Sequence, residues 1–189
     1  MQWIMGACVG IGLSATCGFR VFVPMLGMSI ACKAGHLTLS HGFEWIASWP
    51  AIIAFSIAVI IEVCGYYIPW VDNFLDSIAT PAAIVAGTIV TAAMVGDVSP
   101  FLRWSLAIIA GGGTAGVIQS SSVLVRGTST ATTGGAANPV VSTGELIASI
   151  IGTVLSIVLP VLAIIVIAFI SFIIIRRFIR KRKKLLKDT

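Results

Sequence analysis

Five long apolar segments dominate this sequence and constrain its fold more than any other feature. They run approximately over residues 3–31, 45–68, 81–98, 101–125 and 146–175. A helix that crosses a bilayer needs about 20 mostly apolar residues, because each residue rises about 1.5 Å through a hydrocarbon core about 30 Å thick. Charged residues make up only 10% of the chain, whereas soluble domains contain about a quarter. We therefore predict an all-α membrane protein with about five transmembrane segments, whose main partner is the lipid bilayer.

The basic residues predict the domain organisation and the orientation. Eight of the twelve follow the last apolar segment, between Arg176 and Lys187. Such a run is typical of a cytoplasmic stop signal, so the net charge of +5 does not indicate nucleic-acid binding. We expect one integral membrane domain at 1–175 and a basic cytoplasmic tail at 176–189, in the plasma (inner) membrane of the cell. Five crossings would leave the N-terminus outside, whereas a re-entrant hairpin in place of one crossing would reverse it.

Several segments are expected to depart from straight helices. The first and last are longer than a perpendicular crossing needs, so each must tilt, break or bend, and Pro160 is a natural bend in the last. Glycines predict helix breaks within residues 12–24 and 111–122. Residues 70–78 predict a short amphipathic helix at the membrane interface. Residues 128–144 predict an exposed loop, with turns at Gly134-Gly135 and at Asn138-Pro139.

A short pattern that occurs twice indicates a possible inverted repeat. Glu44-Trp-Ile-Ala-Ser48 recurs as Glu145-Leu-Ile-Ala-Ser149, each time at the start of a long apolar segment and after a glycine-interrupted helix. A real duplication would make the second unit an inverted copy of the first. Transporters often use that plan, with a binding site where two broken helices meet. Chance similarity between apolar segments stays open as the alternative.

Arg20 is a charged residue inside the first apolar segment, where an unpaired charge costs at least about 2.5–3.5 kcal/mol. Glu62 lies about as far after the first loop as Arg20 lies before it, so the two reach a similar depth in an antiparallel helix pair. One interpretation is a structural Arg20–Glu62 ion pair. The other is functional: Arg20 binds an anion or a lipid headgroup, and Glu62 relays a proton or competes for the guanidinium.

A second candidate site combines glycines with hydroxyl and amide side chains. Its residues are Gly111, Gly112, Gly113, Thr114, Gln119 and Ser120. Glycines at a helix break can leave backbone N–H groups free to bind an anion, and neighbouring polar side chains can complete its shell. Small residues also pack membrane helices closely, in patterns such as Gly6-x-x-x-Gly10 and Gly112-x-x-x-Gly116. Polar residues expected at the interface or in loops are Asp72, Asp76, Arg126, Asn138 and Glu145.

No motif indicates an enzyme, a metal site or a bound cofactor. Both histidines, His36 and His41, fall in the first loop. With Glu44 they could bind a metal at the membrane surface, but solvated loop residues are the favoured interpretation, and the sequence shows no Ser/His/Asp set that converges. The four cysteines fall within apolar stretches without metal-ligand spacing, which indicates buried free thiols.

The chain resembles an uncharacterised bacterial membrane-protein family, catalogued as a domain of unknown function, over nearly its whole length. The resemblance rests on an ordered set of short motifs: Gly18-Phe-Arg-Val-Phe-Val-Pro24, Glu62 to Pro69, Asp72-x-x-x-Asp76, Gly111-Gly-Gly, Arg126, and Gly134-Gly-Ala-Ala-Asn-Pro139 through Glu145. Two basic positions of the family pattern are replaced here, within Ser120-Ser-Ser122 and Ala79-Thr-Pro81, so no site built on them carries over. The resemblance implies a polytopic membrane protein and no established activity.

The expected function is a small transporter or lipid-handling protein for an anionic solute or lipid headgroup. In this hypothesis Arg20 attracts the negative charge, the glycine-rich stretch supplies backbone N–H groups, and Glu62 couples protonation. A homodimer is expected because five helices enclose little volume. The alternatives are a non-transporting membrane scaffold and an ion channel.

Overall fold

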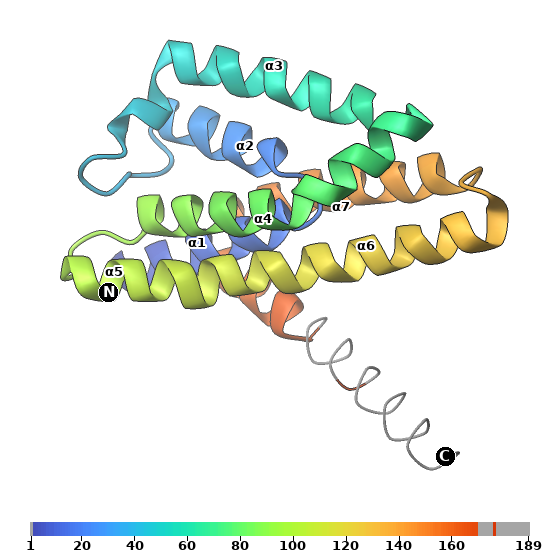
Figure 1. Ribbon diagram of the computed structural model, residues 1–189. Coiled ribbons are helices and arrows are strands. Elements are labelled where there is room, and N and C mark those ends of the chain that lie inside the picture. Colours follow the sequence, from blue (N-terminus) through green and yellow to red (C-terminus); the bar gives the residue numbers. More distant parts are fainter. Residues whose placement is uncertain (1, 170–175, 177–189) are drawn as a thin grey trace.

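The structure is a computed structural model that describes residues 2–169 and 176, and the part it describes consists of helices joined by loops, without strands (Figure 1). The rest of the predicted basic tail lies outside the described residues. The helices are α1 (Gln2–Cys17), α2 (Phe22–Lys33), α3 (Trp49–Gly65), α4 (Pro69–Met94), α5 (Pro100–Leu106), α6 (Gly113–Thr133) and α7 (Asn138–Val158). A short 3-10 helix covers Glu44–Ala47, and a π-helix covers Ala107–Gly112.

Three stretches within the described residues are long and apolar enough to cross a membrane, by length and composition: Phe74–Met94, Pro100–Thr133 and Asn138–Val158. Shorter apolar helices cover Trp3–Cys17, Phe22–Lys33, Trp49–Gly65 and Pro160–Phe169. Large apolar side chains also cover much of the outer surface, as at Ile61, Phe101 and Ile109. The prediction of a helical membrane protein is therefore supported, but the count of about five transmembrane segments is not confirmed.

The first apolar segment is a hairpin of two helices. α1 ends at Cys17, and α2 begins at Phe22 and runs back beside α1. As a result, Trp3 and His36 line the same cavity, at the end of the molecule where the N-terminus lies (Figure 1). The predicted break within residues 12–24 is confirmed, and the break reverses the chain. The hairpin tip therefore points toward the opposite end, where the α3–α4 and α6–α7 connections lie, which we call the α6–α7 end.

Two predicted interruptions are absent. Residues 70–78 form no separate amphipathic helix, because they are the first turns of α4, which continues through Pro81. Residues 111–122 contain no break, because α5, the π-helix and α6 follow one another directly from Pro100 to Thr133. The π-helix ends in Gly111 and Gly112, where a Cβ atom would lie 2.7 Å from the Gly87 carbonyl oxygen and 2.6 Å from Thr88 Oγ1, respectively. These two glycines therefore pack α4 closely, as the small-residue alternative predicted.

The loop predicted at residues 128–144 is mostly helical. α6 continues to Thr133, a turn follows in which Gly134 and Gly135 have φ values of +63° and +90°, and α7 begins at Asn138. The first predicted turn is confirmed, whereas Asn138-Pro139 starts a helix. The threonine hydroxyls of this stretch find their hydrogen-bond partners within α6, where they donate to carbonyls one turn earlier, as Thr128 does to Leu124.

The two copies of the proposed repeat occupy different structural positions. Glu44 is exposed in a 3-10 turn before α3, whereas Glu145 is buried inside α7. The helix before the first copy is interrupted at Gly18, whereas the helix before the second copy, α6, continues without a break through Gly116. The prediction of an inverted repeat with two broken helices is therefore not supported. All four cysteines are free as predicted, although Cys64 is exposed on α3.

Adding one methyl group at the hairpin tip is expected to destabilise the fold. A Cβ at Gly18 would lie 2.6 Å from Ile118 Cβ and 2.7 Å from the Ala115 carbonyl oxygen, so backbone must shift in Gly18→Ala. Overpacking of this kind costs about 1–3 kcal/mol. The matched control is Gly127→Ala, because nothing lies within 4 Å of that position. Thermal unfolding in detergent should show a lower Tm for Gly18→Ala alone, and equal Tm values for the two variants would contradict the close approach.

Candidate functional site

Arg126 and Glu145 form the centre of a buried charge cluster near the α6–α7 end. Arg126, on α6, donates from Nε to Glu145 Oε1 at 3.1 Å and from Nη2 to Glu145 Oε2. Ser122, one turn earlier on α6, also donates to Glu145 Oε1. The exposed fractions of Arg126 and Glu145 are 2% and 7%, so this bidentate pair is shielded from the surroundings.

α4 adds two carboxylates to Arg126. Asp72 accepts from Arg126 Nη1 and, through its other oxygen, from Asn138 Nδ2 at 2.9 Å. Asp76 lies one turn later, with its Oδ1 3.8 Å from Arg126 Nη1. The spacing of four residues between Asp72 and Asp76, which predicted an interfacial helix, instead directs both side chains toward one guanidinium.

Arg20 reaches the same cluster from the hairpin tip. Its Nη2 donates to the Ser142 carbonyl oxygen at 2.9 Å and to Ser142 Oγ at 2.6 Å, and lies 3.8 Å from Glu145 Oε2. The guanidinium carbons of Arg20 and Arg126 lie 3.9 Å and 4.0 Å from the centroid of the Tyr66 ring. Arg20 is 1% exposed, yet its Nε and Nη1 have no hydrogen-bond partner among the described residues.

Glu62 binds backbone N–H groups, whereas the sequence predicted an ion pair with Arg20. Its carboxylate accepts from the backbone N–H groups of Val21 at 2.7 Å and Phe22 at 3.1 Å. The first N–H groups of a helix have no partner within the helix, so Glu62, from α3, caps the start of α2. The predicted Arg20–Glu62 ion pair is therefore wrong: within the described residues the ion-pair partner of Arg20 is Glu145. Glu62 nevertheless contacts the hairpin tip, which carries Arg20.

The distance along the helix between Trp104 and Arg126 is close to the thickness of a bilayer's hydrocarbon core. Arg126 follows Trp104 by 22 residues of a helical run, a rise of about 33 Å at about 1.5 Å per residue. Tryptophan is enriched at membrane interfaces, and the hydrocarbon core is about 30 Å thick. If Trp104 marks one interface, the cluster therefore lies close to the other, within reach of lipid headgroups.

A polar stripe on α7 runs from this cluster toward the opposite end of the molecule. Every buried residue of α7 is polar, and they follow one another at helical spacing: Asn138, Ser142, Glu145, Ser149, Thr153 and Ser156. Ser149 and Thr153 hydrogen-bond to Thr16 of α1, and Ser156 bonds to a carbonyl of its own helix. The stripe packs closely, because a Cβ at Gly12 would lie 2.6 Å from Ser156 Oγ.

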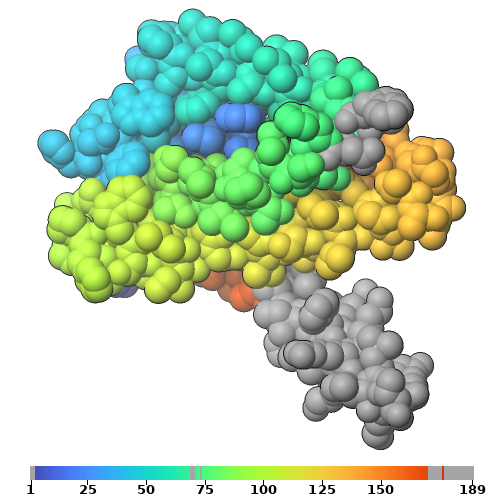
Figure 2. Space-filling view, viewed as in Figure 1, coloured from blue at the N-terminus to red at the C-terminus, as the bar shows by residue number. Residues whose placement is uncertain are grey.

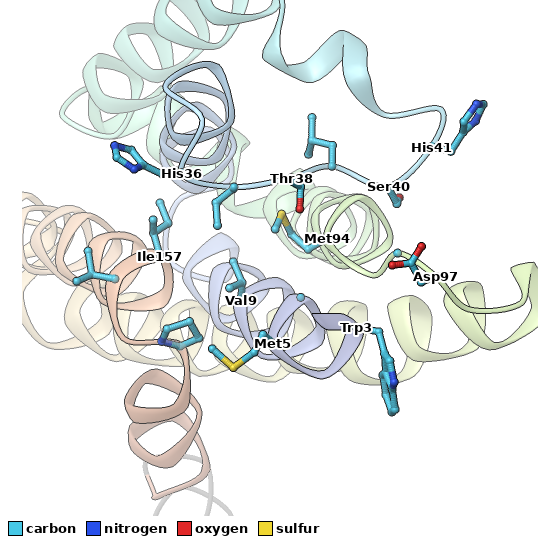
Figure 3. A pocket seen from close by; sticks show the side chains of 16 residues that line it. Trp3, Met5, Val9, His36, Thr38, Ser40, His41, Met94, Asp97 and Ile157 are labelled. Carbon is cyan, nitrogen blue, oxygen red and sulfur yellow. The ribbon is translucent and has the colours of Figure 1, made fainter. Parts of the chain in front are cut away.

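A cavity of about 660 Å³ lies at the opposite end of the molecule, near the far end of this stripe (Figure 3). Its walls come from the start of α1, the loop after α2, the end of α4 and the end of α7. Val9, Met94 and Ile157 give it apolar walls, while His36, His41 and Asp97 are its titratable residues. Figure 2 shows a separate hollow on the molecular surface, where α2 is visible between α3 and α4.

Comparison with known proteins identifies a family. Residues 7–180 match the family described as a domain of unknown function, DUF4126. The chain belongs to this family. No curated protein and no solved structure matches the chain. The resemblance to an uncharacterised family that the sequence motifs indicated is thereby confirmed.

The second set of predicted site residues lies apart from the cluster of this DUF4126 chain. Gly111 and Gly112 pack against α4, and Thr114 donates to the Ala110 carbonyl oxygen. Gln119 is buried, whereas Ser120 is exposed. By contrast, the residues expected at the interface or in loops converge on the cluster: Asp72, Asp76, Arg126, Asn138 and Glu145.

Sequence reasoning missed two residues of the cluster, Tyr66 and Ser142, and grouped Ser122 with the glycine-rich stretch instead of with Glu145. The α7 stripe carries the signal that could have found one of them. Polar residues repeat there every three or four positions within an otherwise apolar helix, and a polar face on a membrane helix points inward. Among the described residues, no group of three His, Cys, Asp or Glu side chains is arranged so that it could hold a metal ion.

Proposed function

We propose that this protein is a small membrane transporter for an anionic solute or lipid headgroup, coupled to protonation of Glu62. The observation that carries the proposal is the position of the Glu62 carboxylate at the N-terminus of α2, beside Arg20. A helix N-terminus favours anions because unpaired N–H groups and the helix dipole both attract negative charge. Glu62 is thus an internal anion in a position that a substrate anion can take.

Protonation provides the coupling in this proposal. A neutral Glu62 no longer offers a negative charge to the N–H groups of Val21 and Phe22, so its hydrogen bonds to them weaken and an anion competes for these N–H groups more easily. An anion that binds there then replaces the lost negative charge. Proton binding and anion binding therefore favour each other.

The two arginines differ in their capacity to bind a further anion. Arg126 has all three nitrogens directed at carboxylates. Arg20 has one carboxylate at 3.8 Å, which already pairs with Arg126, and two nitrogens without a described partner. Arg20 is therefore the proposed substrate-binding arginine, and Arg126 the structural one.

The α7 stripe supports a route between the two ends of the molecule. Its hydroxyl groups connect the charge cluster with the region of the 660 Å³ cavity. In the present conformation the stripe packs against α1, so the route is closed. Displacement of the α1–α2 hairpin, which carries both Arg20 and the Glu62-binding N–H groups, would open it.

Transport can be tested in liposomes that hold purified protein and a pH-sensitive dye. We expect wild-type protein to couple proton flux to movement of at least one probe among chloride, nitrate, phosphate, sulfate and fluorescent phosphatidylglycerol. Glu62→Gln should keep anion movement but lose coupling, because the amide mimics the protonated acid. Arg20→Gln should reduce anion movement by about tenfold or more.

Glu44→Gln is the matched control for Glu62→Gln, because Glu44 is an exposed loop carboxylate and should change neither flux. Wild-type anion movement in Arg20→Gln, or retained proton coupling in Glu62→Gln, would refute the assignment. The absence of flux for every probe would favour the non-transporting scaffold, with which the close packing of Arg126 also agrees. Location in the plasma membrane and assembly as a homodimer remain parts of the same proposal.

A further inference from the structure

Asp76 differs from the other carboxylates of the charge cluster in its hydrogen bonds. Both oxygens of Glu145 accept from Arg126. The two oxygens of Asp72 accept from Arg126 and Asn138. Asp76 Oδ1 is buried as well, but it has no hydrogen-bond partner among the described residues and lies 3.8 Å from Arg126 Nη1. A buried acceptor without a partner is costly, because it has lost its bonds to water and gained none in return. Asp76 therefore has a free oxygen inside the cluster.

The cluster also contains more acidic than basic groups. Its two guanidinium groups are those of Arg20 and Arg126. The carboxylates paired with them belong to three residues, Asp72, Asp76 and Glu145. When every group is ionised, three negative charges therefore face two positive ones. An uncompensated charge is unfavourable in a site shielded from water, because little solvent is present to stabilise it. Binding of one positive charge therefore stabilises the cluster.

A proton fits this requirement better than a metal ion. Metal cations such as Mg²⁺ and Ca²⁺ bind several oxygen ligands at once. The oxygens of Asp72 and Glu145 already accept hydrogen bonds, so among these three carboxylates only Asp76 offers an oxygen that is not engaged. A proton needs one oxygen, with which it forms a covalent O–H bond. The free oxygen of Asp76 therefore favours a proton as the occupant.

Asp76 is also the carboxylate of the cluster that a proton reaches most directly. Its side chain is 17% exposed, against 7% for Glu145 and 2% for Asp72. It lies near the start of α4, whereas the other two carboxylates are enclosed by the elements around them. A proton can therefore pass between Asp76 and the surroundings without displacement of the Arg126–Glu145 pair.

Charged and titratable groups face Asp76 from every element packed around it. They are Asp72 on α4, Tyr66 directly after α3, Arg20 at the hairpin tip, Arg126 on α6 and Glu145 on α7. The two neighbouring carboxylates repel an ionised Asp76, whereas Arg126, which attracts it, already donates to both of them. Proton uptake removes this repulsion and leaves the N–H groups of Arg126 to its two bonded partners.

We propose that Asp76 is the proton-binding site of the charge cluster and takes up a proton before any other carboxylate of the protein as the pH falls. A hydronium ion transfers its proton to an oxygen of Asp76 and leaves as water. The two guanidinium groups then face two carboxylates, so the charge around Arg20 is balanced. This inference goes beyond the proposed function, which assigns the coupled proton to Glu62, and it holds whether or not an anion moves.

Infrared spectroscopy tests the assignment, because a protonated carboxyl group has a C=O stretching band that an ionised carboxylate lacks. Purified full-length protein is measured in a maltoside detergent, which has no ester carbonyl, while the pH is lowered from weakly alkaline to weakly acidic. We expect the first carboxyl band that appears in the wild type to be absent from Asp76→Asn, because the amide takes up no proton. Asp76→Glu keeps a carboxyl group and should shift the frequency of this band, so the test also stands if Asp76→Asn does not fold.

Asp97→Asn is the matched control, since Asp97 is an exposed carboxylate outside the cluster and its removal should leave the first band unchanged. A first band that persists unshifted in the Asp76 variants, or that disappears in Asp97→Asn or Glu62→Gln, would overturn the proposal. So would a Tm that rises with sodium concentration while no band appears, because the site would then hold a metal cation. The infrared result does not depend on transport, so failure of the liposome assay leaves it intact.

Discussion

Glu145→Gln is expected to lower the free energy of unfolding by about 3–5 kcal/mol, the cost of removing one partner from a buried ion pair. Glu145 is the carboxylate that Arg20 and Arg126 share, and it also accepts from Ser122. The amide removes its negative charge and leaves two guanidinium groups against the same Tyr66 ring. Unfolding in detergent by titration with dodecyl sulfate, followed by tryptophan fluorescence, measures the loss.

Glu44→Gln is the control, because Glu44 occupies the matching place in the repeated sequence Glu-x-Ile-Ala-Ser. Its carboxylate is exposed and accepts only from the backbone N–H of Gly42 in the part of the chain described, at 2.9 Å. We expect Glu44→Gln to change stability by less than about 0.5 kcal/mol. Equal losses for the two variants would show that burial and pairing do not distinguish the sites.

The helical membrane fold was predictable from the sequence because it depends on the length and hydropathy of whole segments. The direction that the chain takes after a helix break was not predictable in this way. Gly18 marks where α1 can end, but the backward course of α2 depends on its packing against α3 and against α7, which lies far away in sequence. A glycine-rich segment therefore predicted the place of the hairpin and gave no information on its reversal.

The sequence predicted most of the charged residues that form the site, but it did not predict which of them pair with each other. Burial of Arg20 requires a partner, and Glu62 does reach the same depth, at the hairpin tip. Its oxygens bind Val21 and Phe22 because the start of α2 offers two N–H groups without helical partners. Arg126 was expected in or beside a loop, because the residues after it are polar. The hydroxyls of Thr128 and Thr133 instead donate to carbonyls of α6, which continues past Arg126 to Thr133.

Arg126→Gln is the second variant with a large expected effect, again about 3–5 kcal/mol of unfolding free energy. It removes the cation that pairs with Glu145 and Asp72 and lies 3.8 Å from Asp76. Repulsion among three carboxylates then remains in a site where Asp72 is 1% exposed. Arg103→Gln is the matched control, since Arg103 forms no ion pair within residues 2–169 and 176.

A double-mutant cycle with Asp72→Asn tests whether the pair acts as a unit. Asp72→Asn removes one of the carboxylates that Arg126→Gln leaves uncompensated, so the double variant should be less destabilised than the sum of the single variants. A coupling energy of about 0.5–3 kcal/mol is typical of residues in one network. Additive losses would show that Asp72 does not depend on the charge of Arg126.

The same measurement on Arg20→Gln separates the structural arginine from the proposed functional one. Arg20 keeps only a distant carboxylate, and two of its nitrogens have no described partner, so its removal leaves less unpaired negative charge than removal of Arg126. We therefore expect Arg20→Gln to lose much less stability than Arg126→Gln, while losing anion movement. The reverse order of stabilities would mean that Arg20 holds the fold together, and the assignment of the anion to Arg20 would fail.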